Sequence, residues 1–130
     1  MPVSDTHAMI AGMDPVLEPG TYLFRMAETD RVPPDALASF REPEGLSLIV
    51  RADEPQPGEA VMRLIRLNIM SDLQGVGLIA AVSNRLAAHG IACNVVAALH
   101  HDYLLVPASR ADEAIAQLRA LQAEARESAT

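Results

Sequence analysis

The sequence contains no lysine and no tryptophan, one cysteine, and only two tyrosines and two phenylalanines among 130 residues. Without lysine, Schiff-base chemistry and a phosphate-binding P-loop are excluded, because both need its amine. The ten basic residues are all arginine and are scattered along the chain, whereas acidic residues number seventeen and the net charge is −7. No basic surface that could follow a phosphate backbone is expected, so we expect no nucleic-acid partner.

The sequence also has no long apolar run and no basic segment at its N-terminus. Polar residues interrupt every apolar stretch before it reaches membrane-spanning length, so we expect neither a membrane segment nor a signal peptide. Cys93 has no second cysteine with which to form a disulfide within the chain, and it lies in an apolar run. A buried thiol is therefore expected rather than a reactive one. These features predict a cytoplasmic protein.

What the chain does have is apolar residues, which make up half of it and predict a packed core. At this length we expect one domain or two very small ones. In the first half, the pattern predicts a short helix at 8–14 and strands at 21–28 and 46–52. Residues 36–42 fit either a short strand or a short helix. Residues 53–59, with two prolines and a glycine, are the candidate linker.

The second half has a more regular pattern. It predicts a strand, a helix, two strands and a helix at 61–70, 78–89, 91–99, 103–107 and 109–128. Arg63 and Arg66 break the alternation of the first strand, which indicates a bulge or a sheet edge. Gly90 ends the first helix, and Ser109 is the expected N-cap of the second. A hairpin between two helices fits an antiparallel sheet with helices on one face, an α+β fold.

The loop before the first of these helices carries two glycines in three positions, Gly75 and Gly77. A helix N-terminus offers unpaired N–H groups and partial positive charge, and glycine lets a ligand approach the backbone closely. The amides of 75–78 could therefore hold a carboxylate. Ser71 and Gln74 stand at the spacing of a capping box, so the loop could instead only cap its own helix. The residues themselves leave both interpretations open.

The segment from this loop onward resembles the ACT domain, with Gly77 opening the helix "GLIAAVSNRLAAHGI" and Gly90-Ile91 closing it. Two further motifs are "SxLxxVGL" at 71–78 and "HDxxLVP" at 101–107. They look closer still to small stand-alone bacterial proteins built of two ACT-like units in tandem. More distantly, the sequence is similar to ACT-repeat amino-acid sensors.

The resemblance implies a ferredoxin-like fold with a degenerate first unit at 1–58 and a complete second unit at 59–130. It also implies that an amino acid or a similar small molecule binds between the units, against the loop after the first strand, which favours the ligand interpretation of the glycines. Many ACT domains carry an aspartate three residues before the helix-opening glycine. Here Gln74 holds that position and Asp72 lies farther back, so this role is not transferred to Asp72.

The candidate ligand-binding residues are the loop and two polar residues beyond it. They are Ser71, Asp72, Leu73, Gln74, Gly75, Val76, Gly77, Leu78, Asn94 and Asp102. Asn94 interrupts an apolar strand and faces solvent, a turn or a ligand. Asp102 lies in the predicted hairpin turn, where aspartate is ordinary, but its carboxylate could also hold a cationic group.

No catalytic residues, metal site or cofactor are expected. No nucleophile motif occurs, and the adjacent residues His100, His101 and Asp102 would point alternately to opposite faces of a strand, which disfavours a shared metal ion. The sequence thus predicts a regulatory module that binds an amino acid and forms a homodimer, rather than an enzyme. The alternative is an interaction module that dimerises or docks on another protein without any ligand.

Overall fold

The computed structural model describes residues 5–128. The second half has the predicted order of strand, helix, two strands and helix, whereas the first half is mostly strands and includes one, Pro15–Leu17, that the sequence patterns did not predict. In chain order the elements are α1 (Thr6–Ala11), β1 (Pro15–Leu17), β2 (Tyr22–Met26), β3 (Ala38–Glu42), β4 (Gly45–Arg51), β5 (Met62–Leu67), α2 (Leu78–Ala88), β6 (Asn94–Ala97), β7 (Asp102–Pro107), the 3₁₀ turn η1 (Ala108–Arg110) and α3 (Ala111–Ser128). None of the helices among the described residues is long and apolar enough to cross a membrane.

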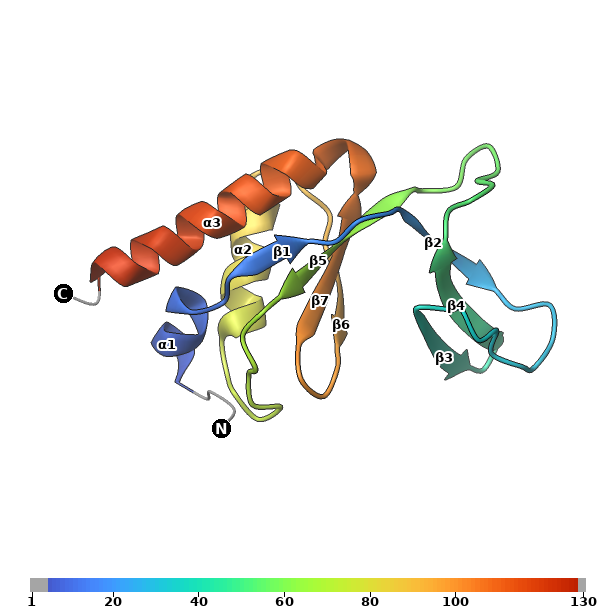
Figure 1. Ribbon diagram of the computed structural model, residues 1–130, viewed down its shortest axis with the longest axis horizontal. Coiled ribbons are helices and arrows are strands. Elements are labelled where there is room, and N and C mark those ends of the chain that lie inside the picture. The colour runs from blue at the N-terminus through green and yellow to red at the C-terminus, as the bar shows by residue number, and fades with distance from the viewer. Residues whose placement is uncertain (1–4, 129–130) are drawn as a thin grey trace.

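The strands form one antiparallel sheet in the order β3-β4-β2-β5-β7-β6. β1 and β2 follow each other along the same edge of β5, β1 pairing near its end and β2 at its start through Tyr22 and Met62. In Figure 1 the three helices lie together beside β1, β5, β6 and β7, whereas β2, β3 and β4 extend away with no helix against them. We call the first group the helical half and the second the open half. The predicted α+β fold is confirmed.

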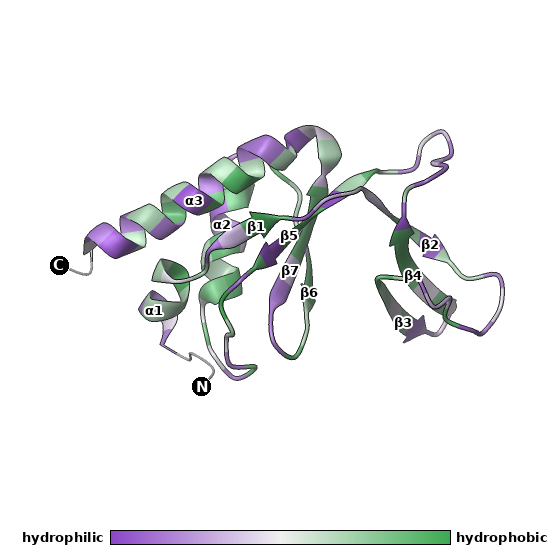
Figure 2. Ribbon diagram, in the orientation of Figure 1, coloured by the Kyte–Doolittle hydropathy of each residue, from purple (hydrophilic) through white to green (hydrophobic). Residues whose placement is uncertain are grey.

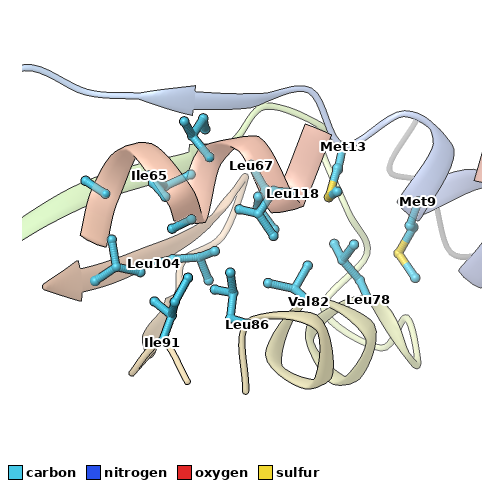
Figure 3. Packing of buried hydrophobic residues seen from close by; sticks show 14 residues of the cluster. Met9, Met13, Ile65, Leu67, Leu78, Val82, Leu86, Ile91, Leu104 and Leu118 are labelled. Carbon is cyan, nitrogen blue, oxygen red and sulfur yellow. The ribbon is translucent and has the colours of Figure 1, made fainter. Parts of the chain in front are cut away.

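The main core lies between the helices and one face of the helical half. Because side chains alternate along a strand, Ile65 and Leu67 of β5 share this face with Leu104 and Val106 of β7. The apolar stripe of α2, with Leu86 among its buried residues, packs against them from the other side. Figure 3 shows Ile65, Leu67, Leu86 and Leu104 converging between the two layers. The packing fixes α2, and with it the glycine loop at its start, on the sheet.

Gly90 ends α2 as the sequence predicts. It adopts a φ of 69°, and its N–H bonds to the Ala87 carbonyl while the Ile91 N–H bonds to the Leu86 carbonyl. These two bonds make a Schellman motif, and Ile91 then packs in the main core. The turn therefore returns the chain directly from α2 to the sheet.

The opposite face of the sheet holds a second, smaller cluster that joins the two halves. Ile49 and Tyr22 of the open half meet Met62, Leu64 and Leu105 there. An apolar cleft of about 180 Å³ opens beside this cluster. We call it the aromatic cleft; its lining is Phe24, Ala38, Ser39, Phe40, Ser47, Ile49 and Val96. All four aromatic residues of the chain, including Tyr103, thus gather on this helix-free face.

Three local predictions need correction. β5 is neither an edge nor bulged, since it pairs with β7 without interruption from Met62 to Leu67 and with β1 and β2 on its other side. Ser109 is not an N-cap, because α3 is preceded by the turn η1, whose own cap residue is Pro107. The first helix begins at Thr6, earlier than predicted, because Asp5 accepts a hydrogen bond from the Ala8 N–H and so caps it.

Candidate functional site

The glycine loop forms one wall of a pocket of about 170 Å³ at the end of the sheet. The first turn of α2, the β6–β7 hairpin and one residue of α1 complete it. The lining residues are Met9, Ser71, Asp72, Leu73, Gly75, Gly77, Leu78, Ile79, Ala80, Ala97, Ala98 and Asp102. We call it the loop pocket. Segments far apart in the sequence meet here because β5 and β7 are neighbours in the sheet and α2 packs across them.

The capping-box interpretation of the loop is wrong. Ser71 does not bond to the backbone of the loop; its hydroxyl donates to the Asp102 carboxylate at 3.3 Å. Asp72 instead organises the turn, because its carboxylate accepts from the Gln74 N–H and its carbonyl from the Gly75 N–H, both at 2.9 Å. This is the local turn that aspartate commonly makes with its own backbone.

Within residues 5–128, the N-terminus of α2 has no side-chain cap. Its cap residue is Gly77 in the left-handed conformation, with φ at 104°, and no side chain of this part of the chain accepts from the first amides of the helix. The first intrahelical bond runs from the Ala81 N–H to the Gly77 carbonyl. The preceding amides, at 78–80, belong to residues that line the loop pocket. Such amides favour an anion, because they combine free donors with the positive end of the helix dipole.

Asp102 stands at the start of β7, on the hairpin side of the pocket, and is half-buried. Burial raises the pKa of its carboxyl above the usual value, while the hydrogen bond from Ser71 and the nearby His101 act in the opposite direction. A carboxylate that is partly removed from water and has no arginine partner gains from a cationic group in the pocket. The loop pocket thus offers an acceptor for a cation on one wall and donors for an anion on another.

α1 covers the outside of the glycine loop. The Thr6 hydroxyl donates to the Val76 carbonyl. A Cβ on Gly77 would lie 2.6 Å from Thr6 Cγ2, and a Cβ on Gly75 would lie 3.0 Å from Met9 Sδ. The two glycines are therefore needed for close packing of α1, and Gly77 also for its positive φ. The glycines serve the fold even before any ligand is considered.

Most of the predicted site residues meet in this pocket. They are Ser71, Asp72, Leu73, Gly75, Gly77, Leu78 and Asp102. The side chains of Gln74 and Val76 are exposed and do not line it. Asn94 also lies elsewhere. It is exposed at the start of β6 and pairs with Leu105, so it shares the helix-free face, whereas Ala97, three residues along the strand, lines the pocket.

Sequence reasoning missed the apolar residues of the pocket lining, because they belong to no recognisable motif. Met9, Ile79, Ala80, Ala97 and Ala98 line the loop pocket with apolar surface. The motif at 71–78 could have pointed to Ile79 and Ala80 as its continuation into the helix. Nothing near Met9 in the sequence indicates that α1 packs on a loop so much later in the chain.

Metal ligands do not gather in the described part of the molecule. Across residues 5–128, no three His, Cys, Asp or Glu side chains lie close enough together to hold a metal ion. The ring of His101 contacts the Ile69 carbonyl at 3.3 Å and meets the ring of Tyr103 edge to face. Its neighbour Asp102 interacts with Ser71.

Comparison with solved structures finds 19 similar chains, among them the following two from bacterial proteins. A protein of unknown function from Vibrio cholerae, described as a possible transport protein, is 33% identical with a TM-score of 0.72; the match covers 86% of this chain and 92% of that one. A protein from Agobacterium tumefaciens is 19% identical with a TM-score of 0.57, covering 79% and 84%, which shows a shared fold alone. No curated protein matches the sequence.

Comparison with protein families finds the ACT domain twice, at residues 2–57 and again at residues 59–120. ACT domains are in general regulatory modules that bind small molecules, and the two matches include no catalytic domain. Together they span nearly the whole chain, including the glycine loop and the hairpin that form the pocket. The chain therefore belongs to the ACT domain family and carries two ACT domains in tandem.

Proposed function

We propose that this protein is a regulatory module that binds a free amino acid in the loop pocket. The observation that supports this most strongly is the pairing of opposite chemistries on its walls: the half-buried carboxylate of Asp102 and the uncapped amides at the start of α2. A zwitterionic amino acid matches both. Its carboxylate accepts from the amides of residues 78–80, and its ammonium group donates to Asp102.

The size and composition of the pocket support a small ligand. Its volume of about 170 Å³ lies below the range of about 300–1,000 Å³ that is usual for drug-sized ligands. The hydroxyl of Ser71 points to Asp102 and so helps to orient the carboxylate that would receive the ammonium group.

The proposed site also joins the two family matches. Met9 comes from the first match and the rest of the lining from the second. This supports a ligand held where the two units meet, with the units divided as 1–58 and 59–130. We further propose that the protein acts in the cytoplasm, where free amino acids report metabolic state, and that it works as a homodimer.

The test is a thermal-shift screen of the amino acids with the wild-type protein and Asp102→Asn. A ligand present at a hundred times its Kd adds about 2.7 kcal/mol to the unfolding free energy, which moves the melting temperature measurably. We expect at least one amino acid to stabilise the wild type and Asp102→Asn to lose most of that shift. The matched controls are Asp35→Asn, a loop aspartate that is exposed, and Asn94→Ala, on the opposite face.

Both controls should keep the full shift. The proposal fails if no amino acid stabilises the wild type, or if Asp102→Asn responds as strongly as the wild type does. Loss of the shift in Asn94→Ala as well would move the site to the other face of the sheet.

A second candidate function is that of an interaction module without a ligand, and the aromatic cleft favours it. Phe40 is 72% exposed and Phe24 is 45% exposed, on a helix-free face that Met26 extends. Exposed apolar surface of this kind commonly marks a contact with another protein. If sedimentation shows a dimer while no amino acid alters the melting temperature, this second function is the better supported one.

A further inference from the structure

One wall of the loop pocket comes from α1, and not from the glycine loop, α2 or the β6–β7 hairpin. Met9 of α1 is 1% exposed and yet lines the pocket. In Figure 3 it stands at the α1 end of the core, beyond Leu78. Its sulfur reaches the loop because Gly75 has no side chain, since a Cβ there would lie 3.0 Å from Met9 Sδ. Met9 therefore limits how far the pocket extends beneath α1.

Other parts of the structure hold α1, the short helix that carries Met9, in place at both of its ends. At the start of α1, Thr6 donates to the Val76 carbonyl of the glycine loop. At its end, the Ala11 carbonyl accepts hydrogen bonds from Gln122 at 2.9 Å and Arg126 at 2.8 Å, both on α3. Gln122 is itself buried, so this contact is part of the packed structure. A wall fixed to two other elements sets a size limit rather than yielding to larger ligands.

The charges around the pocket restrict the ligand in a second way. Its lining contains two aspartates, Asp72 and Asp102, and no arginine. The chain has no lysine, and Arg85 of α2 and Arg110 of η1 bind acidic partners on α3. Among the residues that line the pocket, none carries a cationic side chain that could neutralise an acidic group on the ligand, and such a group would be buried beside like charge at a cost.

Resting on the proposed function, we infer that the loop pocket selects amino acids with short, uncharged side chains and that Met9 is the residue that sets this limit. Glycine, alanine and serine fit this class. Leucine, methionine and phenylalanine are excluded by size, and aspartate and glutamate by charge. Met9 is a specificity-determining residue that acts by its bulk.

The experiment is titration calorimetry of the full-length chain with alanine, leucine and aspartate, comparing wild type, Met9→Ala and Met13→Ala. Met13 is the matched control, because it is also a fully buried methionine of the same core but does not line the pocket. The readout is the ratio of alanine to leucine affinity within each variant, which a general loss of stability does not change.

The wild type should favour alanine over leucine by about tenfold or more, the discrimination that small differences in side-chain size typically produce. Met9→Ala should reduce or reverse that ratio, while Met13→Ala should keep it. Aspartate should bind to none of the three. Met9→Leu, which conserves most of the volume, should retain the wild-type ratio. If Met9→Ala does not fold, Met9→Val, a smaller truncation, takes its place and should lower the ratio in the same direction, and an unchanged ratio in Met9→Val overturns the inference.

The inference is overturned if the wild type binds amino acids but Met9→Ala leaves the ratio unchanged, or if aspartate binds as well as alanine does. In either case the proposed function survives, because an amino acid still binds. If the wild type binds no amino acid in the full screen, the proposed function fails, and this inference falls with it.

Discussion

The helical half and the open half are built from the same antiparallel pairing, yet they bury their residues very differently. In the helical half, α2 and α3 cover one face, and residues such as Leu104 and Leu118 are 0% exposed. In the open half β4 is strongly hydrophobic (Figure 2), but no helix lies against it; Leu23 and Leu48 are still buried on one face, whereas Phe40 on the other face is 72% exposed. An apolar strand pattern alone does not close a core; a second layer must cover it.

The difference also bears on where a ligand site can form. The loop pocket lies in the helical half, where α1, α2 and the hairpin are each held by packing or hydrogen bonds. The aromatic cleft lies where the halves meet, and it is almost wholly apolar. The first has polar groups that can fix the orientation of a small molecule, and the second has surface that suits a protein contact.

The largest effect expected is the contrast between Leu118→Ala and Ile49→Ala. Leu118 is fully enclosed in the main core, so truncation should cost about 2–5 kcal/mol of unfolding free energy. Ile49 lines the aromatic cleft, where water can occupy the space that the truncation leaves. The unfolding free energy lost in Ile49→Ala should therefore lie at or below the lower end of that range. Urea denaturation measures both. Equal losses would mean that the open half is packed as tightly as the helical half.

Next in size is the contrast between Gly77→Ala in the helical half and Gly58→Ala in the loop that follows the open half. Both glycines have positive φ, 104° and 86°, but a Cβ meets Thr6 at Gly77 and nothing within 4 Å at Gly58. The backbone strain alone should cost each about 1–2 kcal/mol. Thermal melts should show a larger loss of stability for Gly77→Ala than for Gly58→Ala. The difference between the two losses measures how much the packing of α1 on the glycine loop contributes to stability. The two variants would melt alike if α1 does not pack on the loop.

Two carboxyl groups, one associated with each half, should give pH dependences of opposite sign. The Arg25 side chain, followed by the Gln56 amide, lowers the pKa of Glu59 to about 2 from its usual 4.5. Its contribution to stability is therefore present above pH 4.5 and is lost as the pH falls toward 2. Melting curves against pH should show the difference between wild type and Glu59→Gln shrinking over this window.

For Asp102 the sign is reversed, because burial raises its pKa. The folded protein binds the proton more tightly than the unfolded chain does, so stability falls as the pH rises through the folded pKa. The same melting curves should show that Asp102→Asn gains stability relative to the wild type as the pH rises above that pKa. A parallel response of Glu59→Gln and Asp102→Asn would contradict the assignment of opposite shifts.

The smallest effect on stability is expected for Phe40→Ser. Because most of the Phe40 side chain is already in contact with water, the unfolding free energy should change by no more than about 0.5 kcal/mol. The informative measurement is analytical ultracentrifugation at increasing concentration. If the aromatic cleft is an interface, Phe40→Ser should weaken self-association while Leu118→Ala, although much less stable, retains it below its melting temperature.

Much of the fold could be read from local patterns. The stripe of α2, the glycine that ends it and the paired strands around the β6–β7 hairpin follow from periodicity and turn chemistry, which act over a few residues. The fold predictions that failed concern the starts of two elements, α1 and α3, and the pairing of another, β5. The 3₁₀ turn before α3 displaced the expected cap at Ser109, and β5 tolerates Arg63 and Arg66 inside the sheet because each reaches Glu18 beside it.

The candidate site was partly predictable for the same reason. Its loop and Asp102 were found because their motifs are contiguous or lie at a turn. The role of Asn94 depended on which face of β6 it occupies, and the pairing with Leu105 decides that. The partner of Ser71 is thirty-one residues away on another strand, beyond the reach of the spacing rule that suggested a cap.

By itself, the sequence determined the order of the elements in the second half, the apolar stripes that build the main core and the exclusion of lysine chemistry. Only the tertiary structure decided that α1 seats against Gly75 and Gly77, that Met9 closes the loop pocket, and that the four aromatic residues share the helix-free face. The physical reason is the separation along the chain over which each kind of interaction acts. Propensity and turn chemistry act between neighbours, whereas these contacts join residues that become neighbours only once strand pairing and helix packing have set the path of the chain.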